Sequence, residues 1–265
     1  MRLATRLKRW LGRLGRAGYA RLPVEVFRRQ PAHHYVPDLY GYTAYKNIDI
    51  FEVSPFGELA HEVRGHGRTY LYFDKLHVIY QALANVAPVV PDGEPLTIAD
   101  VGTFQGGSAY FAAAVAEALH RGPARLHCFD TFGGAVAEDI DVALEPLQER
   151  TRQRGHYEET SVESVRAYLA RFPDTVIHVG RIQDTWSEVS TERFAFVHLD
   201  INLFEPTRAA LDAFGPRMVP GGTIVVDDYG TVSNPGVRKA VDEFYDPAAF
   251  IKFHLLTNQS LLIRR

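Results

Sequence analysis

Short apolar runs alternate with helical segments from residue 96 to residue 265, and this alternation constrains the fold more than any other feature of the chain. The expected strands are rich in β-favouring residues and read LTIADV, ARLHCFD, TVIHVG, FAFVHLD and GGTIVVDD. Between them lie segments with apolar residues every three or four positions, such as SAYFAAAVAEALH and PTRAALDAFGPRM. The last two runs, IKFHLLT and SLLIRR, predict an antiparallel hairpin. This order predicts an α/β fold, with a mostly parallel sheet covered by helices on both faces.

Composition narrows the setting in which the chain works. The hydrophobic content of 46% is enough for a sizeable core, and no run of about 20 apolar residues indicates a membrane span. The single Cys128 excludes an intramolecular disulfide and lies in an expected strand, so we expect a buried thiol and a reducing, cytoplasmic location. Basic residues gather in one segment without an aromatic stacking platform, so no nucleic-acid partner is expected.

The first 30 residues carry many arginines against the single acidic residue Glu25. Large apolar residues recur there at helical spacing, which predicts a basic amphipathic helix. Three roles suit such a helix: contact with an anionic membrane surface, binding of an acidic partner, or docking on a second subunit or on the body of the protein. Docking is the preferred interpretation and favours a homo-oligomer, whereas peripheral membrane contact is the weaker alternative.

The rest of residues 1–65 is expected to be irregular and aromatic-rich. The stretch HHYVPDLYGYTAY either lines a substrate lid or packs this extension onto the body of the protein. We therefore divide the chain into an N-terminal extension, residues 1–68, and a main domain, residues 69–265.

Two acidic segments near the C-terminus, FVHLDINLFEPT and GGTIVVDDYG, place Asp200, Asp227 and Asp228 directly after apolar runs. If the two strands are parallel neighbours, their carboxyl ends lie about 5 Å apart and the three carboxylates share one small volume. Like charges that close require bound protons or a cation. Oxygen ligands suit Mg²⁺, Mn²⁺ or Ca²⁺ rather than zinc, so we expect a hard metal ion at this edge of the sheet.

A glycine-rich turn, DVGTFQGGS, joins the first expected strand to its helix and lets the backbone approach a ligand closely. The helix that follows offers free N–H groups to an anion. The dinucleotide pattern G-x-G-x-x-G is absent, so an amino-acid-like carboxylate is a better ligand than a pyrophosphate. Asp130 ends the second strand, where an acidic residue either binds ribose hydroxyls or caps a turn. Gln183 follows the third strand with a donor and an acceptor for an adenine edge.

Six motifs in this order carry a resemblance to a known family: DVGTFQGGS, FDTFGG, VGRIQDT, HLDINLFEPT, PGGTIVVDDYG and PGVRKAVDEF. Over about residues 70–265 the chain resembles the class I S-adenosylmethionine-dependent methyltransferases. Within that class it looks like the metal-dependent sugar O-methyltransferases of the macrocin O-methyltransferase family, and it is more distantly similar to catechol O-methyltransferase. The resemblance implies a Rossmann-like, seven-stranded, mostly parallel sheet with an antiparallel terminal hairpin strand, helices on both faces and an N-terminal helical extension.

The resemblance also implies the bound groups, S-adenosylmethionine and Mg²⁺, and the residues that hold them. The expected S-adenosylmethionine contacts are Gly102, Thr103, Gly106, Ser108, Asp130, Thr131, Ile182, Gln183 and Asp200. The expected Mg²⁺ ligands are Asp200, Asp227 and Asp228. The expected catalytic positions are Asp200 and Asn202.

The chain departs from this family after the fourth strand. Related sugar methyltransferases usually read D-x-D-L-Y there, with the second aspartate as the suggested base, whereas this chain reads D-I-N-L-F from Asp200 to Phe204. Asn202 has no basic group at neutral pH. Catechol-type enzymes have a lysine three residues after the first aspartate, and this chain does not. Either the base lies elsewhere or the metal alone suffices, and Asn202 then orients the acceptor or binds the metal through its amide oxygen.

Histidines are the alternative bases. His198 shares the strand face of Asp200 but sits deeper, so a hydrogen-bonded core histidine is its better interpretation. The other candidates lie in the N-terminal part: His33, His34, His61 and His66.

The preferred function is S-adenosylmethionine- and Mg²⁺-dependent methyl transfer to a hydroxyl of a sugar or glycosylated natural product that carries a vicinal diol, in secondary metabolism. Alternative acceptors are a phenolic hydroxyl, an amine or a carboxyl group of a small molecule. A catalytically silent methyltransferase-like scaffold is disfavoured because buried carboxylates without a metal are costly. A nicotinamide-dependent oxidoreductase is disfavoured by the absent dinucleotide pattern. We expect residues 1–70 and 134–160 to select the acceptor.

Overall fold

The computed structural model describes residues 50–265, which contain a seven-stranded sheet. The strands are β1 (Leu96–Val101), β2 (Ala124–Asp130), β3 (Thr175–Val179), β4 (Phe194–Leu199), β5 (Met218–Val226), β6 (Phe250–His254) and β7 (Ser260–Arg264). The predicted basic helix, the aromatic stretch after it, and His33 and His34 lie outside the described residues. The predicted domain boundary at residue 68 stays a prediction.

The strands follow the order β3-β2-β1-β4-β5-β7-β6 across the sheet. The first five are parallel, and β7 inserts antiparallel between β5 and β6. The predicted mostly parallel sheet with an antiparallel hairpin strand is thus confirmed. The order of the strands reverses between β1 and β4, and open α/β sheets bind ligands at such a switch point, beyond the carboxyl ends of the strands.

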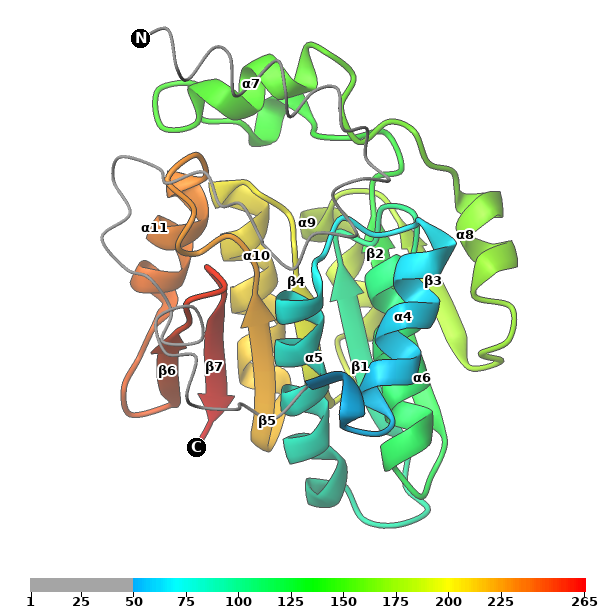
Figure 1. The fold of residues 1–265 in the computed structure, drawn as a ribbon. Coiled ribbons are helices and arrows are strands. Elements are labelled where there is room, and N and C mark those ends of the chain that lie inside the picture. The colour runs from blue at the N-terminus through cyan, green and yellow to red at the C-terminus, as the bar shows by residue number, and fades with distance from the viewer. Residues whose placement is uncertain (1–49) are drawn as a thin grey trace, which may run out of the picture. The chain divides into compact units, whose positions relative to one another are not determined.

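Helices cover both faces of the sheet (Figure 1). On one face, α4, α5 and α6 pack together and against the central strands, and on the other face α10 packs on α9, α11 and β4. The α-helices are α4 (Phe56–His66), α5 (Phe73–Val86), α6 (Gly107–Leu119), α7 (Pro146–Arg152), α8 (Val162–Tyr168), α9 (Ile182–Thr185), α10 (Phe204–Phe214) and α11 (Pro235–Phe244). Short 3-10 helices are η1 (Ile50–Glu52), η2 (Ala87–Val89), η3 (Ala137–Asp139), η4 (Trp186–Val189) and η5 (Gly215–Arg217).

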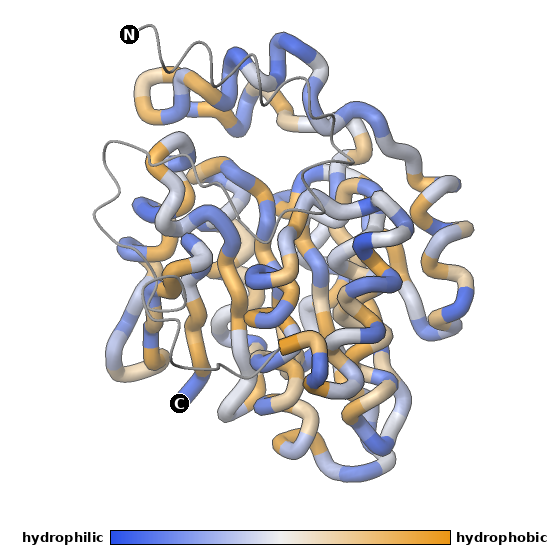
Figure 2. Tube along the Cα trace, viewed as in Figure 1, coloured by the Kyte–Doolittle hydropathy of each residue, from blue (hydrophilic) through white to orange (hydrophobic). Residues whose placement is uncertain are grey.

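Successive residues along a strand pack into two separate hydrophobic cores, one on each face of the sheet. Ile98 of β1 joins the core under α4, α5 and α6, whereas its neighbour Ala99 joins the core under α10 and α11. The same alternation holds in β4 between Phe196 and Val197. Because both faces are buried, the strands read as continuous apolar runs rather than as alternating ones. Figure 2 shows this as hydrophobic strands flanked by helices of mixed hydropathy.

The expectation that residues 1–65 are irregular is wrong for the stretch that forms α4. Phe56, Ala60 and Val63 recur every three or four residues and are fully buried in the core with α5 and α6. This spacing is that of an amphipathic helix. It is short and follows many aromatic residues, which hid it in the sequence.

The segment between β2 and β3 is partly helical and contains η3 and α7. In Figure 1 α7 lies above the carboxyl ends of the strands. Helix α8 begins directly after Ser161, whose hydroxyl accepts a hydrogen bond from Ser164 N at 3.2 Å as its N-cap.

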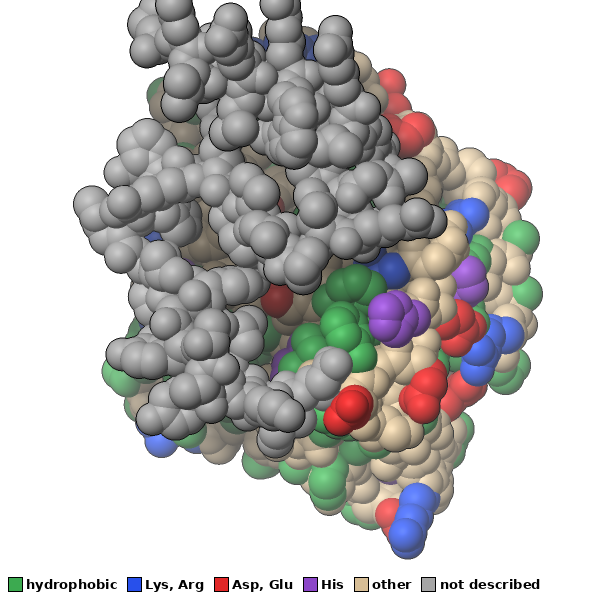
Figure 3. All heavy atoms as spheres, viewed as in Figure 1, with side chains coloured by type: hydrophobic (Ala, Val, Ile, Leu, Met, Phe, Trp, Pro, Cys, Tyr) green, Lys and Arg blue, Asp and Glu red, His purple; other side chains and the backbone are tan. Residues whose placement is uncertain are grey.

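On the coloured part of the surface in Figure 3, acidic and basic side chains are interspersed around a small hydrophobic cluster. No helix among residues 50–265 is long and apolar enough to cross a membrane.

Candidate active site

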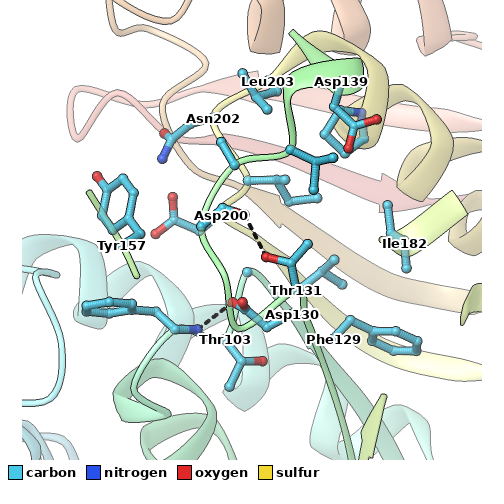
Figure 4. A pocket seen from close by; sticks show the side chains of 18 of the residues that line it. Thr103, Phe129, Asp130, Thr131, Asp139, Tyr157, Ile182, Asp200, Asn202 and Leu203 are labelled. Carbon is cyan, nitrogen blue, oxygen red and sulfur yellow. Dashed lines mark hydrogen bonds between the residues drawn. The ribbon is translucent and has the colours of Figure 1, made fainter. Parts of the chain in front are cut away.

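A pocket opens at the carboxyl ends of the strands, at the switch point between β1 and β4. Most of the residues predicted to bind a ligand line it: Gly102, Thr103, Ser108, Asp130, Thr131, Ile182, Gln183, Asp200, Asn202 and Asp228. Tyr157, Asp200 and Asn202 lie at one end of the pocket, and Phe129 and Ile182 lie at the other (Figure 4). Two predicted residues, Gly106 and Asp227, are absent from the described lining.

The glycine-rich turn after β1 brings its backbone against β4. Gly102 has a φ of 90°, and a Cβ there would lie 2.1 Å from the Asp200 carbonyl oxygen. Only glycine fits that position. Gly106 also has a positive φ, 88°, but a Cβ there would meet Tyr168 of α8 at 3.2 Å. Gly106 therefore shapes the turn and its packing on α8 rather than the pocket wall.

Asp130, at the end of β2, ties two loops of the pocket together. Its carboxylate accepts hydrogen bonds from Phe104 N and from Phe132 N, each at 2.7 Å. Burial raises the pKa of this carboxyl group, and the backbone N–H groups oppose that rise. These hydrogen bonds are those of the predicted turn-capping role. Asp130 also lines the pocket, so its role as a ligand contact stays a prediction.

A buried acid that the sequence reasoning missed, Asp139 of η3, lies beside Gln183. Gln183 Nε2 donates to Asp139 Oδ1 at 2.8 Å, and the Arg181 guanidinium pairs with the same carboxylate. The other end of the Gln183 amide, Oε1, is buried without a hydrogen-bond partner among the described residues. A buried unpaired acceptor at a pocket wall is available to an N–H of a ligand.

The three predicted metal-binding carboxylates meet where β4 and β5 end. These strands are parallel neighbours, as the sequence analysis required. Oxygens of Asp200 and Asp227 belong to a group of atoms that all lie within 4.8 Å of one another. Burial and the charges of Asp227 and Asp228 raise the pKa of the Asp200 carboxyl group to about 8. The raised value reflects the cost of ionising all three carboxylates together.

His198 of β4 lies between this cluster and Asp100 of β1. Register places it beside Asp100, whose Oδ1 lies 2.7 Å from His198 Nδ1, and Asp227 Oδ2 lies 3.3 Å from His198 Nε2. Burial alone would lower the pKa of His198, but the two carboxylates raise it to about 10. Both nitrogens therefore have a carboxylate partner, as expected for a hydrogen-bonded core histidine.

Lys75 of α5, which the sequence reasoning also missed, supplies a cation to the same carboxylates. Its Nζ lies 3.3 Å from Asp228 Oδ1 and 3.5 Å from Asp227 Oδ1. Burial opposes the charge of this ammonium group, but Asp227 and Asp228 raise its pKa above the usual range. Asp227 Oδ1 is buried and accepts no hydrogen bond from the described residues.

The oxygens of Asp200, Asp227 and Asp228 fit a hard divalent cation. Asp200 and Asp227 share a group of possible ligand atoms with His198, but both nitrogens of that histidine already have carboxylate partners, which leaves oxygen donors; Asp227 Oδ1 has no hydrogen-bond partner among the described residues. These are the properties that Mg²⁺ and Mn²⁺ require.

Asn202 is held by a chain of side-chain hydrogen bonds. Asn234 Nδ2 donates to Asn202 Oδ1 and to Asp228 Oδ2, both at 2.7 Å, and Gln148 Nε2 donates to Asn234 Oδ1 at 2.8 Å. Asn202 itself has a φ of 68°, a backbone conformation that asparagine tolerates better than most residues. The chain joins α7 to the ends of β4 and β5.

Three aromatic rings stand beside Asp200. Tyr70 stacks on Phe104 with ring centroids 5.5 Å apart, and Tyr157 meets Phe104 edge-on at 5.6 Å. Tyr70 OH donates to Glu159 at 3.2 Å, which ties this aromatic wall to the segment before α8. Burial raises the pKa of Tyr157 to about 12, with further contributions from Asp200 and Asp228, so its hydroxyl is a donor near neutral pH.

The remaining candidate histidines lie away from this site. His66 Nδ1 lies 2.8 Å from Tyr168 OH, and His61 packs its ring between Phe51 and Phe73. Neither lines the pocket that the described residues form.

The fold is that of known proteins. The O-methyltransferase NovP has a solved structure that matches with a TM-score of 0.63 at 22% identity, over 78% of this chain and 87% of that one. CalS11, a calicheamicin methyltransferase, matches with a TM-score of 0.56 at 19% identity, over 83% of this chain and 95% of that one. These likenesses show the fold, which is that of the class I methyltransferases.

The sequence model of the family described as Macrocin-O-methyltransferase (TylF) matches residues 68–252. The chain belongs to this family, as the motifs of its sequence suggested.

Two relatives have names that state an activity. The first, from Streptomyces olivaceus, is named 8-demethyl-8-(2,3-dimethoxy-alpha-L-rhamnosyl)-tetracenomycin-C 4'-O-methyltransferase and is 32% identical over 148 residues, which are 54% of this chain and 57% of the relative. The second, from Micromonospora griseorubida, is named Mycinamicin III 3''-O-methyltransferase and is 26% identical over 171 residues, 61% of this chain and 65% of the relative. The match thus spans less than two thirds of each relative.

Proposed function

We propose that this protein transfers a methyl group from S-adenosylmethionine to a hydroxyl group of a sugar or of a glycosylated natural product in antibiotic biosynthesis. Membership of the family supports methyl transfer, and the names of the two relatives support a sugar hydroxyl as the acceptor. The observation that carries the proposal is that Asp200 and Asp228 line the pocket, while the buried Asp227 lies beside Asp200 and shares Lys75 with Asp228. That arrangement suits a metal-assisted reaction of a hydroxyl group.

The pocket offers a separate contact for each part of S-adenosylmethionine. The turn at Gly102 and Thr103 admits the methionine moiety, because backbone lies at the wall there without a side chain in between. Asp130, which lines the pocket, is the proposed acceptor of hydrogen bonds from ribose hydroxyls. The unpaired Gln183 Oε1 suits the exocyclic amine of adenine. Ile182 supplies apolar contact to the base.

Arg68 is our candidate for the carboxylate of the methionine moiety. It lines the pocket and bonds only neutral groups, Gln105 O at 2.7 Å and Ser164 Oγ at 2.8 Å. The other arginines of the described lining, Arg152 and Arg181, are each paired with a carboxylate. Arg68 thus retains an uncompensated charge for an anionic ligand.

Asp200, Asp227 and Asp228 are the proposed ligands of Mg²⁺. When bound, S-adenosylmethionine supplies an electrophilic methyl group and Mg²⁺ supplies a Lewis acid that lowers the pKa of a hydroxyl group. The chain's own contribution is position and exclusion of water: the aromatic wall covers the approach to Asp200, and Asn202 turns a donor toward the acceptor. Orientation of this kind contributes on the order of 7–11 kcal/mol in well-aligned reactions.

A second acceptor class is favoured by the aromatic wall. Tyr70, Phe104 and Tyr157 suit the apolar face of a sugar ring, but they equally suit a planar phenol. We therefore keep a phenolic hydroxyl as the alternative acceptor. The buried, free Cys128 fits the cytoplasmic location that we propose for either activity.

The test is calorimetric titration of the metal-stripped protein with S-adenosylhomocysteine, followed by a transfer assay. Radiolabelled S-adenosylmethionine would be offered to a panel of simple rhamnosides and catechols, with Mg²⁺ or with EDTA. Micromolar binding and Mg²⁺-dependent label on a rhamnoside would support the proposal. Label on catechol alone would favour the phenolic alternative, and absence of cofactor binding would refute methyl transfer.

A further inference from the structure

Lys75 lies at an unfavourable position of its own helix. It is the third residue of α5, and a cation in the first turn opposes the helix dipole, at a cost of roughly 0.3–1 kcal/mol. The residue nevertheless turns its side chain inward, where 22% of it is exposed. Something other than the helix therefore stabilises the ammonium group there.

The stabilising partners are two of the three proposed metal ligands. Lys75 Nζ contacts Oδ1 of Asp228 at 3.3 Å and Oδ1 of Asp227 at 3.5 Å. The remaining oxygens of the two carboxylates have other partners: Asp228 Oδ2 accepts from Asn234, and Asp227 Oδ2 faces His198. Lys75 thus contacts the other oxygen of each carboxylate; of these two oxygens, Asp228 Oδ1 also accepts a hydrogen bond from Thr231 Oγ1 at 2.9 Å, and Asp227 Oδ1 accepts none from the described residues.

A divalent cation would use one of the same oxygens. Asp227 Oδ1 is buried without a hydrogen bond from the described residues, so it is the oxygen of that carboxylate that would be available to a metal ion, and Lys75 lies 3.5 Å from it. An ammonium group and a divalent cation on the same oxygens repel each other, and the repulsion is strong where water is largely excluded. Binding of one must weaken binding of the other by the same factor, because the two equilibria are linked.

We propose that Lys75 is an internal counter-ion that competes with the divalent cation for Asp227 and Asp228 and withdraws into the pocket when the cation binds. This inference rests on the proposed metal site. It gives α5 a defined part in the site: the lysine holds the carboxylates together before the cation arrives and sets a lower affinity for it than three carboxylates alone would have.

The first test measures Mn²⁺ affinity by calorimetry and electron paramagnetic resonance in the presence of S-adenosylhomocysteine. Lys75→Met keeps the apolar stem and removes the charge, so Mn²⁺ should bind about tenfold or more tightly than to the wild type. Lys75→Arg keeps the charge and should not show this gain. Lys239→Met is the matched control, since it makes the same change at an exposed lysine of α11 and should leave the affinity unchanged.

The second test uses the unaltered protein and needs no variant to fold. Amine-reactive acetylation followed by mass spectrometry compares Lys75 with Lys239 in the same sample. Saturation with Mn²⁺ should raise the labelling rate of Lys75 several-fold and leave that of Lys239 unchanged. An unchanged or slower rate at Lys75 would overturn the proposed withdrawal.

The outcomes separate this inference from the function on which it rests. Equal Mn²⁺ affinity in wild type and Lys75→Met overturns the competition and leaves the metal site intact. If neither protein binds Mn²⁺ while both bind S-adenosylhomocysteine, the metal site and the competition both fail, and methyl transfer without a metal remains to be judged by the transfer assay. Tighter binding in Lys75→Met alone supports the inference.

Discussion

Asn234 Nδ2 lies 2.7 Å from Asn202 Oδ1, and this contact determines which end of the Asn202 amide faces the pocket. The same nitrogen lies 2.7 Å from Asp228 Oδ2, and a carboxylate can only accept, so the assignment of the Asn234 amide is forced. Asn202 must therefore present its oxygen to Asn234 and its NH₂ group to the space beside Asp200 and Tyr157 (Figure 4). Asn202 is then a hydrogen-bond donor in the pocket, and its amide oxygen is not free to bind a metal.

The first prediction concerns this donor. Asn202→Asp restores the carboxylate that related enzymes usually carry, but it replaces a donor by an acceptor next to three other carboxylates. We expect methyl transfer to fall by about 10–100-fold, the value of a lost hydrogen bond of this kind, because an acceptor hydroxyl loses its partner. S-adenosylhomocysteine affinity should stay near that of the wild type. Higher transfer in Asn202→Asp, with a rate that rises through the pKa of a carboxyl group, would instead show that this position works best as a base.

A second prediction concerns the hydrogen-bonded chain from Gln148 to Asp228. Asn234→Ala leaves one buried and two partly buried polar groups without their partner and should lower the free energy of unfolding by about 2–3 kcal/mol. It also cuts a tether of α7, so residues 135–160 should become more sensitive to limited proteolysis. Gln153→Ala, at the C-cap of α7, is the control, because that side chain is exposed and among the described residues bonds only to Glu149. Equal cleavage of both variants would argue against the tether.

A third prediction concerns Arg68 as the partner of the cofactor's carboxylate. Arg68→Gln should weaken S-adenosylhomocysteine binding by about tenfold or more, as expected for a hydrogen bond between charged groups. Binding of 5′-methylthioadenosine, which has no carboxylate, should not change, and calorimetry measures both. Arg121→Gln makes the same charge change at an exposed ion pair with Asp92 and serves as the control. Equal losses for the two ligands would mean that Arg68 acts through folding of the pocket.

Much of the fold followed from the sequence because most elements have strong local signals. The mainly apolar runs at β1 and β2 match the predicted strands residue for residue, because burial on both faces favours β-forming apolar residues along most of each strand. The meeting of Asp200 with Asp227 also followed, because parallel neighbours end at one edge. Helix α4 was missed because it is short and lies after a long aromatic stretch.

The partners of the predicted carboxylates were harder to foresee, because they come from distant segments. Lys75 lies more than 120 residues before Asp200, and its weak local signal was a cation in the first turn of a helix. Asp100 offered a clearer signal, as a charged residue inside an apolar strand, and it proves to hold His198. The position of Asn234 before Pro235 suggested only a helix start, whereas its side chain reaches Asn202.

The last prediction uses His127, a buried histidine of β2 remote from the pocket. Its Nδ1 lies 3.1 Å from His178 Nε2, and its Nε2 has no partner among the described residues. Burial, with the nearby charges of His178 and Arg125, lowers the pKa of His127 from 6.5 to about 4. The folded protein therefore favours the neutral form of the His127 side chain. The stability that depends on a neutral His127 is fully present above pH 6.5 and is lost as the pH falls toward 4, because the unfolded chain takes up a proton at this side chain before the folded protein does.

His127→Phe removes this titration while keeping a planar ring against Phe194. The wild type should then lose about 2 kcal/mol more than His127→Phe when urea unfolding is compared between pH 7 and pH 5, because protons bind the unfolded histidine first. His156→Phe, at an exposed histidine, should follow the wild type. Parallel losses in wild type and His127→Phe would show that His127 does not limit stability in acid.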